Sequence, residues 1–187
     1  MSPTTLLLPT YKQMLRTLTG LLDKAEAQQP DRAEQLLSAS IASDMYPLAT
    51  QLRFAAFQAQ EAVFRLLGEP VPEALLAVAA EARDAGDAPG SIADARVRID
   101  QALAFLDTLP DDCLDESGTT PITIDAPGRG IFDLTGAEYV RDWALPQFYF
   151  HVLMAYAILR GEGVDIGKAD YVPHMFAYLR PETGIPA

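Results

Sequence analysis

The chain has 187 residues, of which 26 are acidic and 14 basic, so its formal charge at pH 7 is −12 and its isoelectric point is about 4.4. This length suits one domain with a substantial core, and we expect a single domain over residues 1–187. The negative field repels phosphate backbones and anionic lipid surfaces, which disfavours nucleic acid and membranes as partners. Cys113 is the single cysteine, which excludes an intramolecular disulfide and a zinc–thiolate cluster. Residues 1–5 lack the basic region of a signal peptide, so a cytoplasmic location is expected.

The first third of the chain reads as helices separated by short breaks. Apolar residues recur at three- and four-residue steps and predict a long helix over residues 4–27, then a weaker helical stretch over 33–39. A second long helix is predicted from Ser43 to Leu67, with Pro47 in its first turn. The sequence Gly68-Glu-Pro70 provides its stop signal.

The middle of the chain predicts one short and one long helix. Residues 72–85 are rich in Ala and Glu and could form the short one. Ser91 is a good N-cap with Asp94 three residues on, an arrangement that resembles a capping box. The apolar stripe that follows predicts a third long helix over residues 92–109.

A strand-like excursion and a fourth long helix follow. Short β-branched runs at residues 119–125 and 131–134 flank a Pro/Gly turn, which predicts a hairpin that must pack on the helices. The fourth helix is predicted from residue 135 or 136 to about Gly161, with a kink at Pro146. Four long helices with one long crossover predict an all-α four-helix bundle.

The most informative segment is Ala144–Leu159, which has sixteen residues without a formal charge. Apolar residues lie on all sides of this helix, so we expect it at the bundle centre or at a subunit interface. It is too short to span a bilayer, which needs about 20 apolar residues. Its aromatic residues on every side are typical of a core combined with a homodimer interface.

A polar stripe lies along the second predicted helix. Residues at four- and three-residue steps share this line, namely Asp44, Leu48, Gln51, Ala55, Gln58 and Ala62. Buried polar groups need partners, and bundle cores place sites on facing helices, so Asp44 and Gln51 are candidate site residues. Alternatively, Asp44 caps the helix and the two glutamines lie at the boundary of the core.

His151 is the candidate metal ligand on the fourth helix. It shares a face with Trp143, Gln147, Phe148, Met154, Ala155 and Ile158. A catalytic metal usually takes three protein ligands, but Ala155 stands at the i+4 position where a second histidine would complete a pair. Asp44 could add one ligand, and a third would have to be Gln51, Tyr156 or His174. The alternative is a core histidine that is hydrogen-bonded to a carboxylate or a carbonyl.

Two stretches resemble the DUF1993 family, a branch of the DinB/YfiT-like superfamily of four-helix bundles. The first is Ala42-Ser-Asp-Met-Tyr-Pro-Leu48 with Gln51 and Leu66-Leu-Gly68. The second and longer one is Leu145-Pro-Gln-Phe-Tyr-Phe-His151, continued by Ala155-Tyr-Ala-Ile-Leu-Arg160 and Gly163-Val-Asp-Ile-Gly-Lys-Ala-Asp170. With the helix spacing between them, the resemblance covers nearly the whole chain and is weakest over residues 72–90.

The resemblance implies a DinB-like scaffold, in which dimers are common. Many members of the superfamily resemble metalloenzymes with one histidine on the second helix and an HxxxH pair on the fourth. His151 matches the first histidine of that pair, while the second falls at Ala155 and the second helix has no histidine. Gln147 also stands where the family's Asn is expected after Pro146. The resemblance therefore implies the scaffold with an incomplete metal site.

Three classes of function follow from these observations. The first is binding of a small ligand or partner, without a resident cofactor, in a pocket lined by Asp44, Gln51, Trp143, His151 and Tyr156. The second is a metal-dependent enzyme of the thiol-transferase or hydrolase type, in which His151 holds a Zn, Ni or Fe ion, with Asp44 as a second ligand. The third is a structural or stress-related homodimer without pocket chemistry. The choice rests on analogy at the level of the fold.

Overall fold

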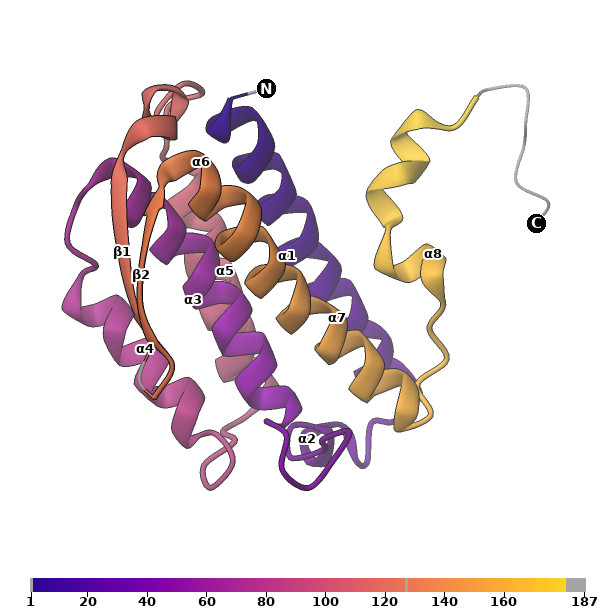
Figure 1. The fold of residues 1–187 in the computed structure, drawn as a ribbon. Coiled ribbons are helices and arrows are strands. Elements are labelled where there is room, and N and C mark those ends of the chain that lie inside the picture. The colour runs from indigo at the N-terminus through magenta and orange to yellow at the C-terminus, as the bar shows by residue number, and fades with distance from the viewer. Residues whose placement is uncertain (1, 127, 181–187) are drawn as a thin grey trace.

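Four long helices form the body of the molecule in a computed structural model that describes residues 2–126 and 128–180 (Figure 1). They are α1 (Pro3–Gln28), α3 (Leu48–Leu67), α5 (Ile92–Asp107) and α7 (Leu145–Gly161). Both α1 and α3 contact α5 and α7, and α3 also contacts α1, so the helices close a four-helix bundle. This confirms the predicted architecture. The central helix is α3, which also packs on α4 (Glu73–Asp84), so α7 is more peripheral than its apolar sequence indicated.

The helix ends follow the predicted capping signals. The Ser91 hydroxyl accepts a hydrogen bond from the Asp94 backbone N–H at 3.1 Å, and the Asp94 carboxylate accepts one from the Ser91 N–H at 2.8 Å. This capping box starts α5. Helix α3 ends at Gly68, whose φ of 69° lies in the left-handed region that suits glycine.

The predicted start of the second long helix was wrong. Helix α3 begins at Leu48, and Pro47 is its N-cap with an extended backbone (φ −73°, ψ 171°). A proline disfavours helical geometry in the residue before it, so the helix cannot continue upstream through Tyr46. Asp44 therefore lies in an exposed turn before the helix, outside the inward-facing stripe that was predicted.

The connections between the long helices carry the smaller elements. The first connection holds α2 (Ala33–Leu36), and the second holds α4, as predicted. After α5 come η1 (Asp115–Thr119) and the hairpin of β1 (Pro121–Ala126) and β2 (Gly130–Thr135). The two strands pair antiparallel, with Ile124 opposite Phe132.

The hairpin covers one flank of the bundle. Figure 1 shows it running beside α3 toward α4. Alternate residues of β1, Ile122 and Ile124, are buried, whereas β2 is largely exposed and leaves 43% of Phe132 accessible. One buried face is what a two-stranded sheet needs in order to pack on helices, as the sequence predicted.

The fourth predicted helix is divided into three segments. Helix α6 (Gly136–Glu138) leads into a π-helical segment, η2 (Tyr139–Ala144), and then into α7. In η2 the Leu145 N–H donates to the Val140 carbonyl, five residues back. Pro146 has no N–H to donate, and it lies just after this π-helical segment, in the first turn of α7. The backbone stays helical through Ala144 and Leu145, so Pro146 lies within a continuous helical path, as predicted, and the local departure from α-helical geometry is the π-helical segment before it.

The C-terminal segment lies beside the bundle. It contains α8 (Lys168–Tyr171) and η3 (Pro173–Tyr178), and Figure 1 shows it along the flank of the bundle and not across its end. Lys24 on α1 forms an ion pair with Asp170 at 2.6 Å, which fixes α8 to that helix. The described part of this segment thus packs along α1, and residues 181–187 lie outside the described residues.

A buried arginine positions α4 against the bundle. Arg53 on α3 is 2% exposed and donates to the Glu81 carboxylate at 2.6 Å, to the Ala49 carbonyl at 3.1 Å and to the Pro89 carbonyl at 2.9 Å. Arg98 on α5 binds the same carboxylate. These charge-assisted bonds connect three helices and the loop before α5.

No helix in the described part of the chain combines the length and apolarity needed to cross a bilayer.

Candidate functional site

The predicted site residues lie in four separate places. Gln51 and His151 meet inside the bundle, and Trp143 lines a groove on its flank. Tyr156 faces the C-terminal segment, where its ring centroid is 5.6 Å from that of Tyr171. Asp44 is exposed in the turn before α3. The structure therefore does not assemble these five residues into one pocket.

Gln51 and His151 form a closed polar pair in the core. Gln51 is 1% exposed and His151 is 7% exposed. The Gln51 amide nitrogen donates to the Tyr46 carbonyl at 3.0 Å, so its oxygen faces His151 Nδ1 at 2.7 Å. The Nδ1 atom must then carry the proton and donate, which sets the tautomer of the ring. Both side chains thus satisfy the partner rule for buried polar groups.

Burial keeps the His151 imidazole neutral. Loss of solvation disfavours the charged form and lowers its pKa from 6.5 to about 4. The ring stacks on Phe54, with centroids 5.1 Å apart and planes at 28°, and Phe150 meets it edge-on at 5.5 Å. Because aromatic side chains surround the ring, no charged group offsets the free-energy cost of burying a protonated imidazole.

The residues around His151 do not fit a three-ligand metal centre. The Nε2 atom is the one ring nitrogen left without a hydrogen bond to the described residues. The next turn of α7 offers only Ala155, and both ends of the Gln51 amide are occupied. Across the described ranges, no group of three or more His, Cys, Asp or Glu residues could hold a metal ion. His151 alone supplies one donor where a catalytic zinc takes three from the protein.

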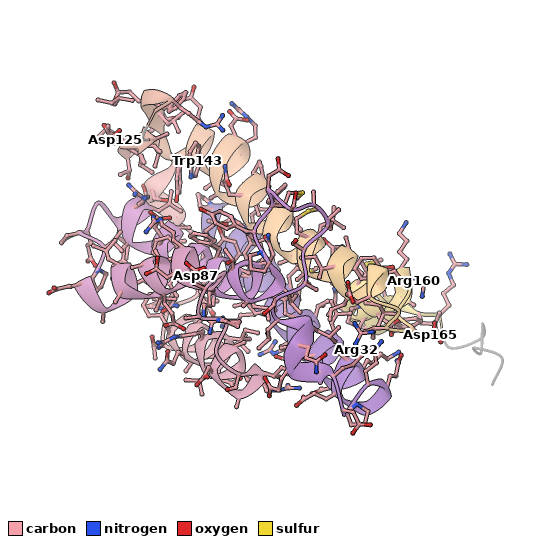
Figure 2. All side chains as sticks on the ribbon, turned by 90° about the horizontal axis from the view of Figure 1, so that it is seen from below. Arg32, Asp87, Asp125, Trp143, Arg160 and Asp165 are labelled. Atoms are coloured by element: carbon pink, nitrogen blue, oxygen red, sulfur yellow. The ribbon has the colours of Figure 1, made fainter. Side chains whose placement is uncertain are left out.

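A groove of about 850 Å³ opens on the other side of Phe54. Residues from α3, α4, the hairpin, η2 and the start of α7 line it: Phe54, Phe57, Gln58, Glu61, Arg65, Leu76, Ala79, Arg83, Ile124, Asp125, Ala126, Arg129, Phe132, Trp143 and Gln147. We call this the flank groove. Figure 2 shows Asp125 and Trp143 together at the hairpin end of the molecule. Its volume is in the range of small-molecule sites.

Gln58 brings a buried polar atom without a partner to the lining of the flank groove. Its side-chain oxygen is buried and accepts no hydrogen bond from the described residues. A buried acceptor without a partner destabilises the folded protein, which is why native structures contain few of them. Gln147 adds a second side-chain amide to the groove lining.

Most of the groove could not be read from the sequence. The sequence placed Trp143, Gln58 and Gln147 on helical faces, but nothing in it marked the charged residues of α3 and α4 as part of a site. Those residues become a lining only because the hairpin folds over α3, where Arg65 donates to the Thr123 carbonyl at 3.4 Å. The expectation that the hairpin must pack on the helices was the one available signal.

The fold and these sites define a DinB-like four-helix bundle. The chain is 30% identical, over 90% of each chain, to a crystallised DinB family member from Shewanella denitrificans, with a TM-score of 0.71. Residues 4–172 match the model of the family described as "Domain of unknown function (DUF1993)", and the chain belongs to that family. No curated protein sequence matches the chain.

Proposed function

We propose that this protein binds a small organic ligand in the flank groove. The observation that carries the proposal is a groove of ligand size whose lining includes Gln58, a side chain with a buried, unpartnered oxygen. Rotation of the Gln58 side chain would bring this acceptor to a hydrogen-bond donor on the ligand, and the aromatic lining would contact the apolar body of the ligand. The expected cytoplasmic location agrees with a soluble metabolite as the ligand.

The same proposal gives His151 a positioning role without a metal. Gln51 holds the imidazole through Nδ1, and the imidazole stacks on Phe54, whose ring lines the flank groove. The pair thus supports a groove wall from inside the bundle. A metal-dependent thiol transferase or hydrolase would need further ligands beside His151, and among the described residues no group of three or more His, Cys, Asp or Glu could hold a metal ion.

The uncharged dye N-phenyl-1-naphthylamine tests the proposed site. Trp143 is the only tryptophan and lines the groove, so bound dye should accept energy from it and quench its emission. We expect one saturable site per chain, and we expect Gln147→Phe, which fills the groove, to weaken binding at least about tenfold. Absence of saturable binding, or equal binding to Gln147→Phe, would overturn the proposal.

A second candidate function is homodimer formation through α7. Tyr149, Phe150 and Leu153 on this helix are 37%, 48% and 46% exposed. Clustered exposed apolar side chains are typical of interaction surfaces, and a second copy would cover them by two-fold symmetry.

Sedimentation of matched variants tests the dimer. We expect a dimer for the native chain and a monomer for Leu153→Lys, because the new charge would be buried at the interface. Val97→Lys is the control, since Val97 on α5 is 49% exposed but lies outside α7. A monomeric native chain, or equal dissociation by both variants, would contradict this assignment.

A further inference from the structure

The charges and rings of the flank groove specify a class of ligand. Building on the proposed ligand site, we propose that the groove binds a monoanionic organic molecule with a planar apolar body and an N–H or O–H donor. The anionic group would meet Arg83 and Arg129, the planar body would meet the aromatic side chains, and the donor would meet Gln58.

The lining of the flank groove has a net positive charge, whereas the chain as a whole has a net negative charge. Three arginines line it, Arg65, Arg83 and Arg129, against two carboxylates, Glu61 and Asp125. The balance is 3 minus 2, or +1, in a chain whose net charge is −12. A net charge of one favours a single anionic group over a polyphosphate, because further negative charge would face the two carboxylates.

Two of the three arginines have no carboxylate partner. Arg65 is occupied by Glu61, at 2.7 Å. Arg83 lies over the Phe54 ring at 5.9 Å, and neither it nor Arg129 forms an ion pair with any described residue. Arginines without a carboxylate partner remain available to an external anion.

The opposite end of the molecule shows the usual arrangement. There Arg32 pairs with Glu162 at 2.6 Å, and Arg160 pairs with Asp165 at 3.3 Å. Figure 2 shows Arg32, Arg160 and Asp165 together, far from Asp125 and Trp143. Arg16 and Lys168 also lack a carboxylate partner among the described residues, so the distinguishing feature of the flank groove is that two such cations line the same groove.

The apolar part of the lining favours a planar molecule. Four aromatic side chains contribute to it, Phe54, Phe57, Phe132 and Trp143. Flat rings match other flat rings in offset or edge-to-face contacts, and Arg83 can stack on a planar group as it does on Phe54. Gln58 adds one buried acceptor, which calls for a donor on the ligand.

Two dyes that differ by one charge separate these requirements. 8-Anilinonaphthalene-1-sulfonate has the planar rings, an N–H and one sulfonate, while N-phenyl-1-naphthylamine has the same rings and N–H without the sulfonate. Energy transfer from Trp143 reports on both. We expect the anion to bind about tenfold more tightly to the native chain, from two exposed ion pairs.

Two double variants with the same change in net charge locate the effect. Arg83→Gln with Arg129→Gln should remove the tenfold preference. Arg16→Gln with Lys168→Gln is the matched control, because both residues are exposed, form no ion pair with the described residues and lie outside the groove. The control should keep the preference, since at physiological salt the electrostatic effect of an exposed charge is screened beyond about 8 Å.

Each outcome decides one claim. A tenfold preference lost only in the groove variant supports the inference. Equal affinity of the native chain for both dyes overturns the anion assignment but leaves the ligand site standing. Equal losses in both double variants also overturn it, because the preference would then come from the long-range field. Failure of both dyes to bind saturably overturns the proposed function itself.

Discussion

Gln51 and Gln58 lie seven residues apart on α3, two turns along one helix. Their side-chain amides nevertheless differ in whether the oxygen has a hydrogen-bond partner. Gln51 donates to the Tyr46 carbonyl and faces His151 Nδ1. The oxygen of Gln58 is buried without a partner at the flank groove. In the first region the two side chains are hydrogen-bonded to each other, while the second contains a buried acceptor without a partner among the described residues.

This difference shows where ligand chemistry can occur in the molecule. A buried hydrogen-bonded pair contributes to stability, and this one has only the Nε2 atom of His151 left to offer a ligand. An unsatisfied acceptor beside unpaired arginines has a cost in the free protein that a ligand would relieve. We call the Gln51–His151 pair the closed region and the flank groove the open region. The sequence pointed to His151, which lies in the closed region, and contained few signs of the groove.

The largest expected effect is the response of the closed pair to acid. The His151 pKa is about 4 when folded and 6.5 in the reference state, so the unfolded chain binds the proton more tightly. Its contribution to stability is present above pH 6.5 and is lost as the pH falls toward 4, by about 3 kcal/mol in total. Urea denaturation at several pH values measures it.

The control for this pH effect is the double variant Gln51→Leu with His151→Phe, which keeps every other titrating group. Its free energy of unfolding should fall less than that of the native chain between pH 7 and 4. If the difference between the two curves stays constant over that range, His151 does not have a depressed pKa.

The next largest effect is the removal of one member of the closed pair. Gln51→Leu leaves the buried His151 N–H without an acceptor, so we expect a loss of about 2 kcal/mol at pH 7. The double variant with His151→Phe should recover part of this loss, because both polar groups are then gone. An additive double variant would show that the two side chains are not coupled.

The matched substitution in the open region should have a much smaller effect. Gln58→Leu removes an acceptor that has no partner, so stability should stay within about 0.5 kcal/mol or rise. Affinity for 8-anilinonaphthalene-1-sulfonate should fall several-fold in the same variant. A loss of stability as large as that of Gln51→Leu would erase the distinction between the two regions.

The smallest expected signal is the metal content. Protein purified without an affinity tag should hold less than about a tenth of an equivalent of zinc, nickel or iron, because His151 alone offers one ligand. Stoichiometric metal that is lost in His151→Ala would restore the metalloenzyme hypothesis.

Helix periodicity, capping residues and the family resemblance predicted the bundle and its hairpin. These signals are local, and the structure confirms α1, α5 and the hairpin close to their predicted bounds. The start of α3 was wrong because Pro47 acts as an N-cap and not as a first-turn residue. That single shift removed Asp44 from the predicted site.

The site was harder to predict because its parts come from different elements. Periodicity placed His151 inward and Gln51 on the facing helix, and these two do meet. It could not show that β1 folds over α3 and turns Arg65 and Asp125 into the lining of a groove. Such tertiary placement depends on long-range packing, which a single sequence does not display.

The most direct test of the distinction between the regions is a nuclear magnetic resonance titration with 8-anilinonaphthalene-1-sulfonate. The side-chain amide of Gln58 and the indole N–H of Trp143 should shift at saturation, while the Gln51 amide and the His151 ring stay unchanged. Shifts at Gln51 and His151, with Gln58 and Trp143 unaffected, would contradict the account and return the ligand site to the bundle core.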